Sequence, residues 1–182
     1  MRLKDYKYEE IKCEVIHMFI KYDIKCLPIS GFEIATKMGI KLIPYSTLSE
    51  KKWKAAMQCS EDGFYFSPGN GTEYIYYNDS KSYERQNWTF LHELGHCVLG
   101  HHEGMDPDEA EAEANFFAKY AIAPPVLVQR FHPKESEDIE VVFRLSHEAA
   151  LYTYEYYKKW LIFSGRGYTS YEMDLLNQFK AA

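Results

Sequence analysis

The sequence predicts an α+β fold that is mostly helical, with a small sheet of about three strands packed on one central helix. Apolar residues recur at helical spacing over much of the chain. Two β-favouring aromatic runs flank a turn-forming segment between residues 66 and 74, which is typical of a hairpin. Residues 88–99 are apolar almost all round, as expected of a buried helix. The 182 residues suffice for one sizeable core, so we predict a single domain over residues 1–182.

The composition excludes several classes of protein. The apolar share of 46% and the charged share of 26% are those of a globular protein. A net charge of -6 argues against a broad nucleic-acid footprint and suits a basic protein partner better. The four cysteines form no Cys-x-x-Cys pair, which favours reduced thiols. The N-terminus lacks an apolar signal segment, and no apolar run is long enough to span a bilayer, so we expect a cytoplasmic protein with no membrane partner.

The first half of the chain alternates helices with strands. Apolar spacing predicts an N-terminal helix over residues 6–25 that ends before Leu27-Pro28. Capping-box patterns at Ser30-Gly31-Phe32-Glu33 and Thr47-Leu48-Ser49-Glu50 predict two shorter helices. A strand over residues 40–45 and the hairpin over residues 64–77 give a sheet region at 40–77. An edge of this sheet could hold an extended substrate by strand addition. A sheet that only packs on the central helix, with no role in substrate binding, is an equally good interpretation.

The second half is predicted to be helical throughout. A central helix spans residues 82–100, and a second spans residues 107–122, with Asp106 as its cap, Pro107 at its first position and Pro124-Pro125 as its stop. A short helix to Phe131 follows. The C-terminal helices cover residues 138–163, the first capped by Asp138 and the second by Ser146, and a last helical turn or two is expected within residues 171–179.

The central helix carries the motif His92-Glu93-Leu94-Gly95-His96. Residues four apart share one face of a helix, so His92 and His96 can bind one metal ion, while Glu93 lies beside its open side. Zinc in such a site lowers the pKa of a bound water to about 7, and a neighbouring carboxylate can accept its proton. The motif predicts a zinc peptidase with one ion per chain and Glu93 as the catalytic base.

A catalytic zinc site needs a third protein ligand, which we expect from the helix over residues 107–122. Glu111 is favoured because Asn115 lies one turn further along the same stripe, where it could support a ligand by a hydrogen bond. Glu113 lies about 160° round the helix from Glu111, so both cannot be ligands, and Glu113 remains the alternative.

Other histidines compete for a role in the site. His102 follows His96 at the spacing of the extended motif His-Glu-x-x-His-x-x-Gly-x-x-His, but Leu99 occupies the position that needs glycine. We therefore expect His101 and His102 to be exposed loop residues. A second donor to the developing oxyanion is unassigned, and His147 or Tyr152 is our guess for it.

Three blocks of the chain resemble the ImmA/IrrE family of metallopeptidases. They are RQNWTFLHELGH at residues 85–96, EAEANFFA at 111–118 and FRLSHEAA at 143–150. The similarity runs from about Gly31 to Trp160, with one mild departure, Ile122-Ala123-Pro124 in place of the family's usual Leu-Met-Pro. The resemblance implies a zincin-like, gluzincin-type fold, one zinc held by His92, His96 and Glu111, and Glu93 as catalytic base.

The resemblance also implies a regulatory role. Members of this family cleave a helix-turn-helix transcriptional repressor, which releases mobile-element or stress genes. The substrate here would be a separate protein. Two alternatives remain open: a peptidase-like regulator that binds the repressor without cleaving it, and a DNA-binding module at residues 138–163, which the charge pattern of that segment disfavours.

Overall fold

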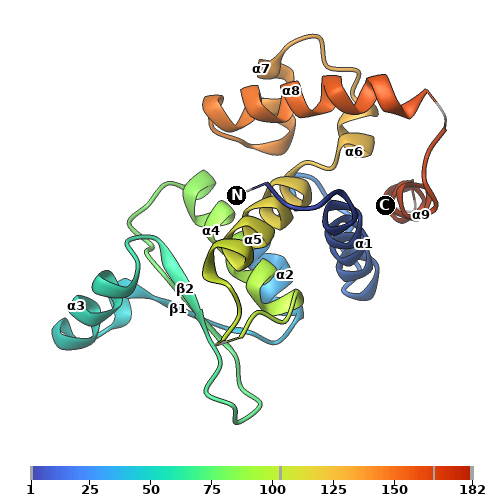
Figure 1. Cartoon of the computed structure of the whole chain (residues 1–182). Helices are drawn as coiled ribbons and strands as arrows, with labels where there is room; N and C mark the ends of the chain where they lie inside the picture. The colour runs from blue at the N-terminus through green and yellow to red at the C-terminus, as the bar shows by residue number, and fades with distance from the viewer. Residues whose placement is uncertain (1, 103, 166, 181–182) are drawn as a thin grey trace.

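The computed structural model describes residues 2–102, 104–165 and 167–180. The predicted α+β class is confirmed: the chain is mostly helical, with one three-stranded sheet (Figure 1). The elements are, in order, α1 (Asp5–Lys21), α2 (Gly31–Lys37), β1 (Lys41–Pro44), the 3-10 turn η1 (Tyr45–Thr47), α3 (Glu50–Cys59), β2 (Gly63–Phe66), β3 (Tyr74–Tyr77), α4 (Tyr83–Val98), α5 (Pro107–Ile122), α6 (Pro125–Gln129), α7 (Ser136–Phe143), α8 (His147–Ser164) and α9 (Ser170–Lys180).

The sheet has the order β1-β3-β2, with β1 parallel and β2 antiparallel to the central strand β3. The predicted hairpin is therefore present as β2 and β3, which pair Tyr65 with Ile75. Ile75 is fully buried, and both hairpin strands pack on α4. Strand β2 lies at an edge of the sheet, so the backbone groups on its outer side face away from β3.

Helix α4 occupies the centre of the molecule, between the hairpin strands, α2 and α5 (Figure 1). Its N-cap is Ser82, whose hydroxyl accepts a hydrogen bond from the backbone N–H of Arg85. Contact with α5 is close because Gly95 has no side chain: a Cβ there would lie 3.1 Å from the Cα of Ala114 and 3.2 Å from the Cβ of Phe117. This close contact brings the residues of α5 beside the two motif histidines.

A buried amide fixes α2 against α4. The Asn87 side chain, only 3% exposed, accepts a hydrogen bond from the backbone N–H of Gly31 at 2.7 Å and donates one to the carbonyl of Ile29 at 2.9 Å. These bonds satisfy backbone groups at the start of α2 that would otherwise be buried without partners.

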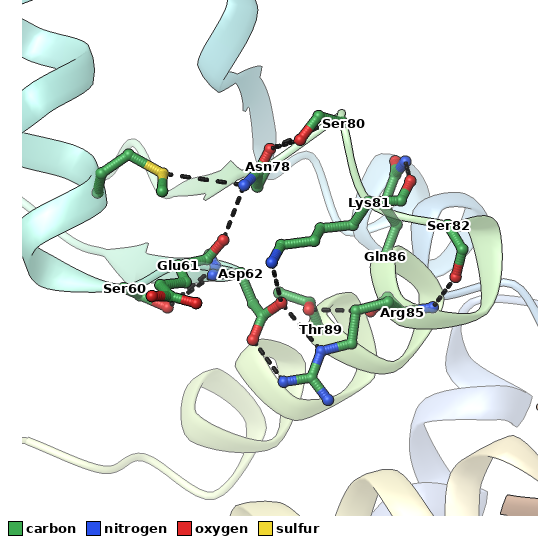
Figure 2. Close-up of polar contacts among 12 residues, drawn as sticks. Ser60, Glu61, Asp62, Asn78, Ser80, Lys81, Ser82, Arg85, Gln86 and Thr89 are labelled. Atoms are coloured by element: carbon green, nitrogen blue, oxygen red, sulfur yellow. Dashed lines mark hydrogen bonds and ion pairs between the residues drawn. The ribbon is translucent and has the colours of Figure 1, made fainter. Parts of the chain in front are cut away.

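A polar network joins the sheet to the start of α4 (Figure 2). The guanidinium of Arg85 binds the Asp62 carboxylate through two nitrogens, with the Nε hydrogen bond 2.9 Å long. Lys81 reaches the same carboxylate at 3.9 Å, and Asn78 donates to the carbonyl of Glu61 at 2.9 Å. The bidentate geometry orients the first turn of α4 relative to the loop before β2.

Helix α3 lies beside the sheet, whereas α1, α6, α7, α8 and α9 lie on the side of α5 away from the sheet (Figure 1). Helix α1 packs on α5 and on α9, while α8 packs on α6 and α7. None of the helices in the described ranges is long and apolar enough to cross a membrane.

Two helix boundaries in the first half differ from the predictions. Helix α1 ends at Lys21 rather than near residue 25, because the chain turns at Asp23, which has a φ of 53°. Thr47 does not start a helix. It lies in η1, and α3 begins at Glu50 after Ser49.

Two boundaries in the second half also differ. Asp138 does not cap α7, which begins two residues earlier at Ser136. Its carboxylate instead accepts hydrogen bonds from the backbone N–H groups of Lys134 and Glu135, so it acts from inside the first turn. Helix α9 has 11 residues and is longer than the turn or two expected.

Candidate metal centre

The structure brings together the three side chains that the sequence analysis put forward as metal ligands. His92 and His96 project from one face of α4 with their Nε2 atoms 3.2 Å apart. Each Nε2 lies 3.4 Å from a carboxylate oxygen of Glu111, which comes from α5. Among the described residues these three form a group whose ligand atoms all lie within 4.8 Å of one another.

These separations fit a tetrahedral zinc ion. Zinc binds histidine nitrogen and carboxylate oxygen at about 2.0–2.2 Å, and tetrahedral geometry then places neighbouring ligand atoms about 3.3–3.6 Å apart. The observed values of 3.2 and 3.4 Å are close to that range. Two imidazoles and one carboxylate are also a recognised catalytic donor set, which leaves a fourth position for water. His92, His96 and Glu111 could therefore hold zinc.

Glu111 and Glu113 point to different places, as their angular separation on the helix requires. The Glu111 side chain is 58% exposed and faces the two histidines. The Glu113 side chain is 5% exposed, and it contacts His101 and Lys7 instead. The structure thus places Glu111, not Glu113, in the group with His92 and His96.

Both motif histidines are held in the form that a metal needs. Burial, together with the nearby His92 and His101, lowers the pKa of His96 to about 4. Burial also lowers the pKa of His92, although Glu111 opposes the effect. Both imidazoles are therefore neutral near pH 7 and keep a lone pair for a metal.

Glu93 lies beside the group, only 8% exposed. Its Oε2 accepts a hydrogen bond of 2.8 Å from the backbone N–H of Tyr65 in the edge strand β2. Burial and, to a smaller extent, the negative charge of Glu111 raise the pKa of the Glu93 carboxyl, the hydrogen bond from Tyr65 lowers it, and the net result is a pKa of about 7. A carboxylate with a pKa near neutrality is well matched to general-base catalysis.

The role of Tyr65 was not foreseen from the sequence. The contact is made by its backbone N–H, a group that every residue except proline carries, so no side-chain pattern could have indicated it.

His101 corrects an expectation. We expected an exposed loop residue, but the His101 side chain is only 5% exposed. It contacts both His96 and Glu113. Gly100 explains the placement, because it has a φ of 70° and reverses the chain after α4, so that the N–H of His101 bonds to the carbonyl of His96 at 3.0 Å. This helix-ending glycine was the sequence signal that could have identified His101.

The other expected residues are placed as follows. Asn115 donates a hydrogen bond of 2.7 Å to the backbone carbonyl of Glu111, and its side chain also favours the charged form of His92. His102 is exposed.

The Nδ1 of His147 lies 3.2 Å from Glu140, and Tyr152 lines a cavity of about 500 Å³ between α4, α5 and α8. The structure brings neither His147 nor Tyr152 into the three-residue group, and the oxyanion donor stays unassigned.

Comparison with known families agrees with this geometry. A search among curated proteins finds no significant match to the chain. A family model described as Peptidase M78, IrrE N-terminal-like domain, matches residues 36–156, which is about two thirds of the 182 residues and includes the motif helix and α5. The chain therefore belongs to the M78 peptidase family, the family of IrrE N-terminal-like domains.

Proposed function

We propose that this protein is a zinc-dependent endopeptidase that holds one zinc ion with His92, His96 and Glu111 and uses Glu93 as its general base. The observation that carries the proposal is the convergence of the three ligand side chains, with the buried Glu93 carboxylate beside them. Membership of a peptidase family supports the same reaction class.

A zinc ion held by His92, His96 and Glu111 would supply a water of lowered pKa and polarise the scissile carbonyl. Glu93 would act as the general base that takes a proton from the attacking water, and it could then return that proton to the leaving amine nitrogen. The hydrogen bond from the Tyr65 backbone N–H to Oε2 fixes the orientation of the Glu93 carboxylate. Burial keeps the basicity of Glu93 high enough for this role.

The substrate is proposed to be a separate helix-turn-helix transcriptional repressor, whose cleavage in the cytoplasm would release the genes that it silences. The support for this substrate is the family resemblance of the three sequence blocks. A net charge of -6 is compatible with a basic DNA-binding partner. The edge strand β2 adjoins Glu93, so an extended segment paired with that strand would pass beside the base.

Glu93→Gln tests the proposal. The purified chain should bind one zinc ion and cut the repressor encoded next to its own gene, and the variant should retain the zinc but lose the cleavage. Glu109→Gln, on α5 but outside the three-residue group, is the matched control and should cut normally. If the wild-type chain and Glu93→Gln both release the repressor from its operator without fragments, the protein is a binding regulator and not a peptidase.

A further inference from the structure

A continuous series of four side chains runs from the metal centre into the interior. The Nδ1 of His96 lies 2.9 Å from the Nδ1 of His101, and the Nε2 of His101 lies 3.0 Å from Oε2 of Glu113. The other oxygen of Glu113 forms an ion pair of 2.9 Å with the ammonium of Lys7. The four residues come from α4, the turn after it, α5 and α1.

The hydrogen-bonding groups fix the direction of this series. The Nε2 of His96 faces His92 and Glu111, so a neutral His96 that offers this nitrogen to a metal carries its hydrogen on Nδ1. The Nδ1 of His101 then accepts that hydrogen, and the Nε2–H of His101 donates to Glu113. A carboxylate can only accept, which suits its position at the end of the series.

Lys7 makes a buried carboxylate tolerable there. The Glu113 side chain is 5% exposed, and a charge so buried is costly without a partner. The Lys7 ammonium, 2.9 Å from Oε1 of Glu113, is the counter-charge to this buried carboxylate.

The two motif histidines differ in whether their Nδ1 atom has a hydrogen-bond partner. Among the described residues the Nδ1 of His92 is buried without a hydrogen-bond partner, whereas that of His96 has His101. Outer partners of metal-binding histidines fix the orientation of the ring and the position of its hydrogen. Lys7 also lies outside residues 36–156, the segment matched to the peptidase family.

We propose that His101, Glu113 and Lys7 are positioning residues for His96, and that helix α1 completes the metal centre from outside the segment matched to the family. The inference rests on the proposed function only in requiring that the centre binds zinc. It does not depend on the identity of the substrate or on catalysis.

Zinc affinity of the full chain, measured by competition with a coloured chelator, tests the role of His101. His101→Ala should weaken zinc binding about 10–100-fold, the usual cost of losing an outer hydrogen-bond partner. His101→Gln should stay within about threefold of the wild type, because its amide can accept from His96 and donate to Glu113. A packing defect alone would give no such rescue.

Lys7→Ala tests the part played by α1. Its zinc affinity should fall about threefold to tenfold, less than for His101→Ala because two groups intervene between Lys7 and His96. Lys4→Ala, which removes an exposed lysine just before the same helix, is the matched control and should bind zinc as the wild type does. Nitrogen-15 NMR of the zinc-loaded chain should show the His96 hydrogen on Nδ1, exchanging faster with water in His101→Ala.

The outcomes separate this inference from the proposed function. Wild-type zinc affinity in both His101→Ala and Lys7→Ala would overturn the inference and leave the peptidase proposal intact. Equal losses in His101→Ala and His101→Gln would also overturn it, since the loss would then reflect packing. A wild-type chain that binds no zinc would overturn both, whereas zinc binding without cleavage would remove only the proposed function.

Discussion

Gly95 lies where α4 packs against Ala114 and Phe117 of α5, and Gly95→Ala should separate the two helices. The new Cβ would lie 3.1 Å from the Cα of Ala114, 3.2 Å from the Cβ of Phe117 and 3.3 Å from the carbonyl oxygen of Ala114. Favourable contacts between carbon atoms lie at about 3.5–4.0 Å, so the shortfall is about half an ångström. Two of the three opposing atoms belong to the backbone of α5, so that helix must move as a unit.

Two effects of opposite sign decide the stability of this variant. Replacing glycine by alanine inside a helix is worth about 1 kcal/mol through helix propensity. An extra methyl group in a packed core typically costs about 1–3 kcal/mol. We expect a net loss of about 1 kcal/mol, which for a chain of this size lowers Tm by about 2–4 °C. Movement of α5 also shifts Glu111 relative to His92 and His96, so zinc affinity should fall.

Urea unfolding at equilibrium measures the change in the free energy of unfolding, and competition with a chelator measures the change in zinc affinity. Ala55→Gly, at an exposed position in α3, calibrates the propensity difference without any steric change and should cost about 1 kcal/mol. The reasoning is refuted if Gly95→Ala is more stable than the wild type by about that amount and binds zinc equally well.

Asn87→Ala leaves two backbone groups buried without partners, the N–H of Gly31 and the carbonyl of Ile29. At about 1–3 kcal/mol each, the free energy of unfolding measured by urea titration should drop by about 2–6 kcal/mol, and a drop under about 1 kcal/mol would contradict this reasoning. The hydrogen bond from Arg85 lowers the pKa of the Asp62 carboxyl. The pair therefore stabilises the fold at pH values above the ordinary Asp pKa of about 3.8, and this stabilisation is lost as pH falls. The stability difference between the wild type and Asp62→Asn should therefore shrink as pH falls below about 3.8 and through the lower pKa of the folded state, and a constant difference would argue against the pair. Zinc at 100 times its dissociation constant should raise the free energy of unfolding by about 2.7 kcal/mol, so calorimetry with and without a chelator should show a clear shift in Tm, and equal values would count against a folded-state site.

Local patterns in the sequence identified most elements of the fold. The predicted cap at Ser146 places the start of α8 where the structure has it, because a capping hydroxyl satisfies backbone N–H groups within three residues of itself. The prediction failed at Asp138, where the same chemistry operates from the third helical position instead of the cap. Sequence alone does not distinguish these two registers when several polar residues stand in a row.

The sequence by itself determined that His92 and His96 share a face, with Glu93 beside them, because the helical repeat fixes those relations within a single element. It limited the candidates for the third metal ligand to Glu111 and Glu113 on α5, which face nearly opposite directions. Which of the two meets the histidines was decided by the approach of α5 at Gly95, which depends on how two helices pack.

Contacts between segments distant in sequence were settled by the tertiary structure alone. The N–H of Tyr65 reaches Glu93 because β2 is an edge strand lying on α4, and Lys7 reaches Glu113 because α1 packs on α5. Residues 28 and 106 positions apart meet in these contacts, and no local periodicity links them. The spacing of residues in a helix or strand predicts which of them share a face of that element. Which faces of different elements contact each other depends on how the whole core packs.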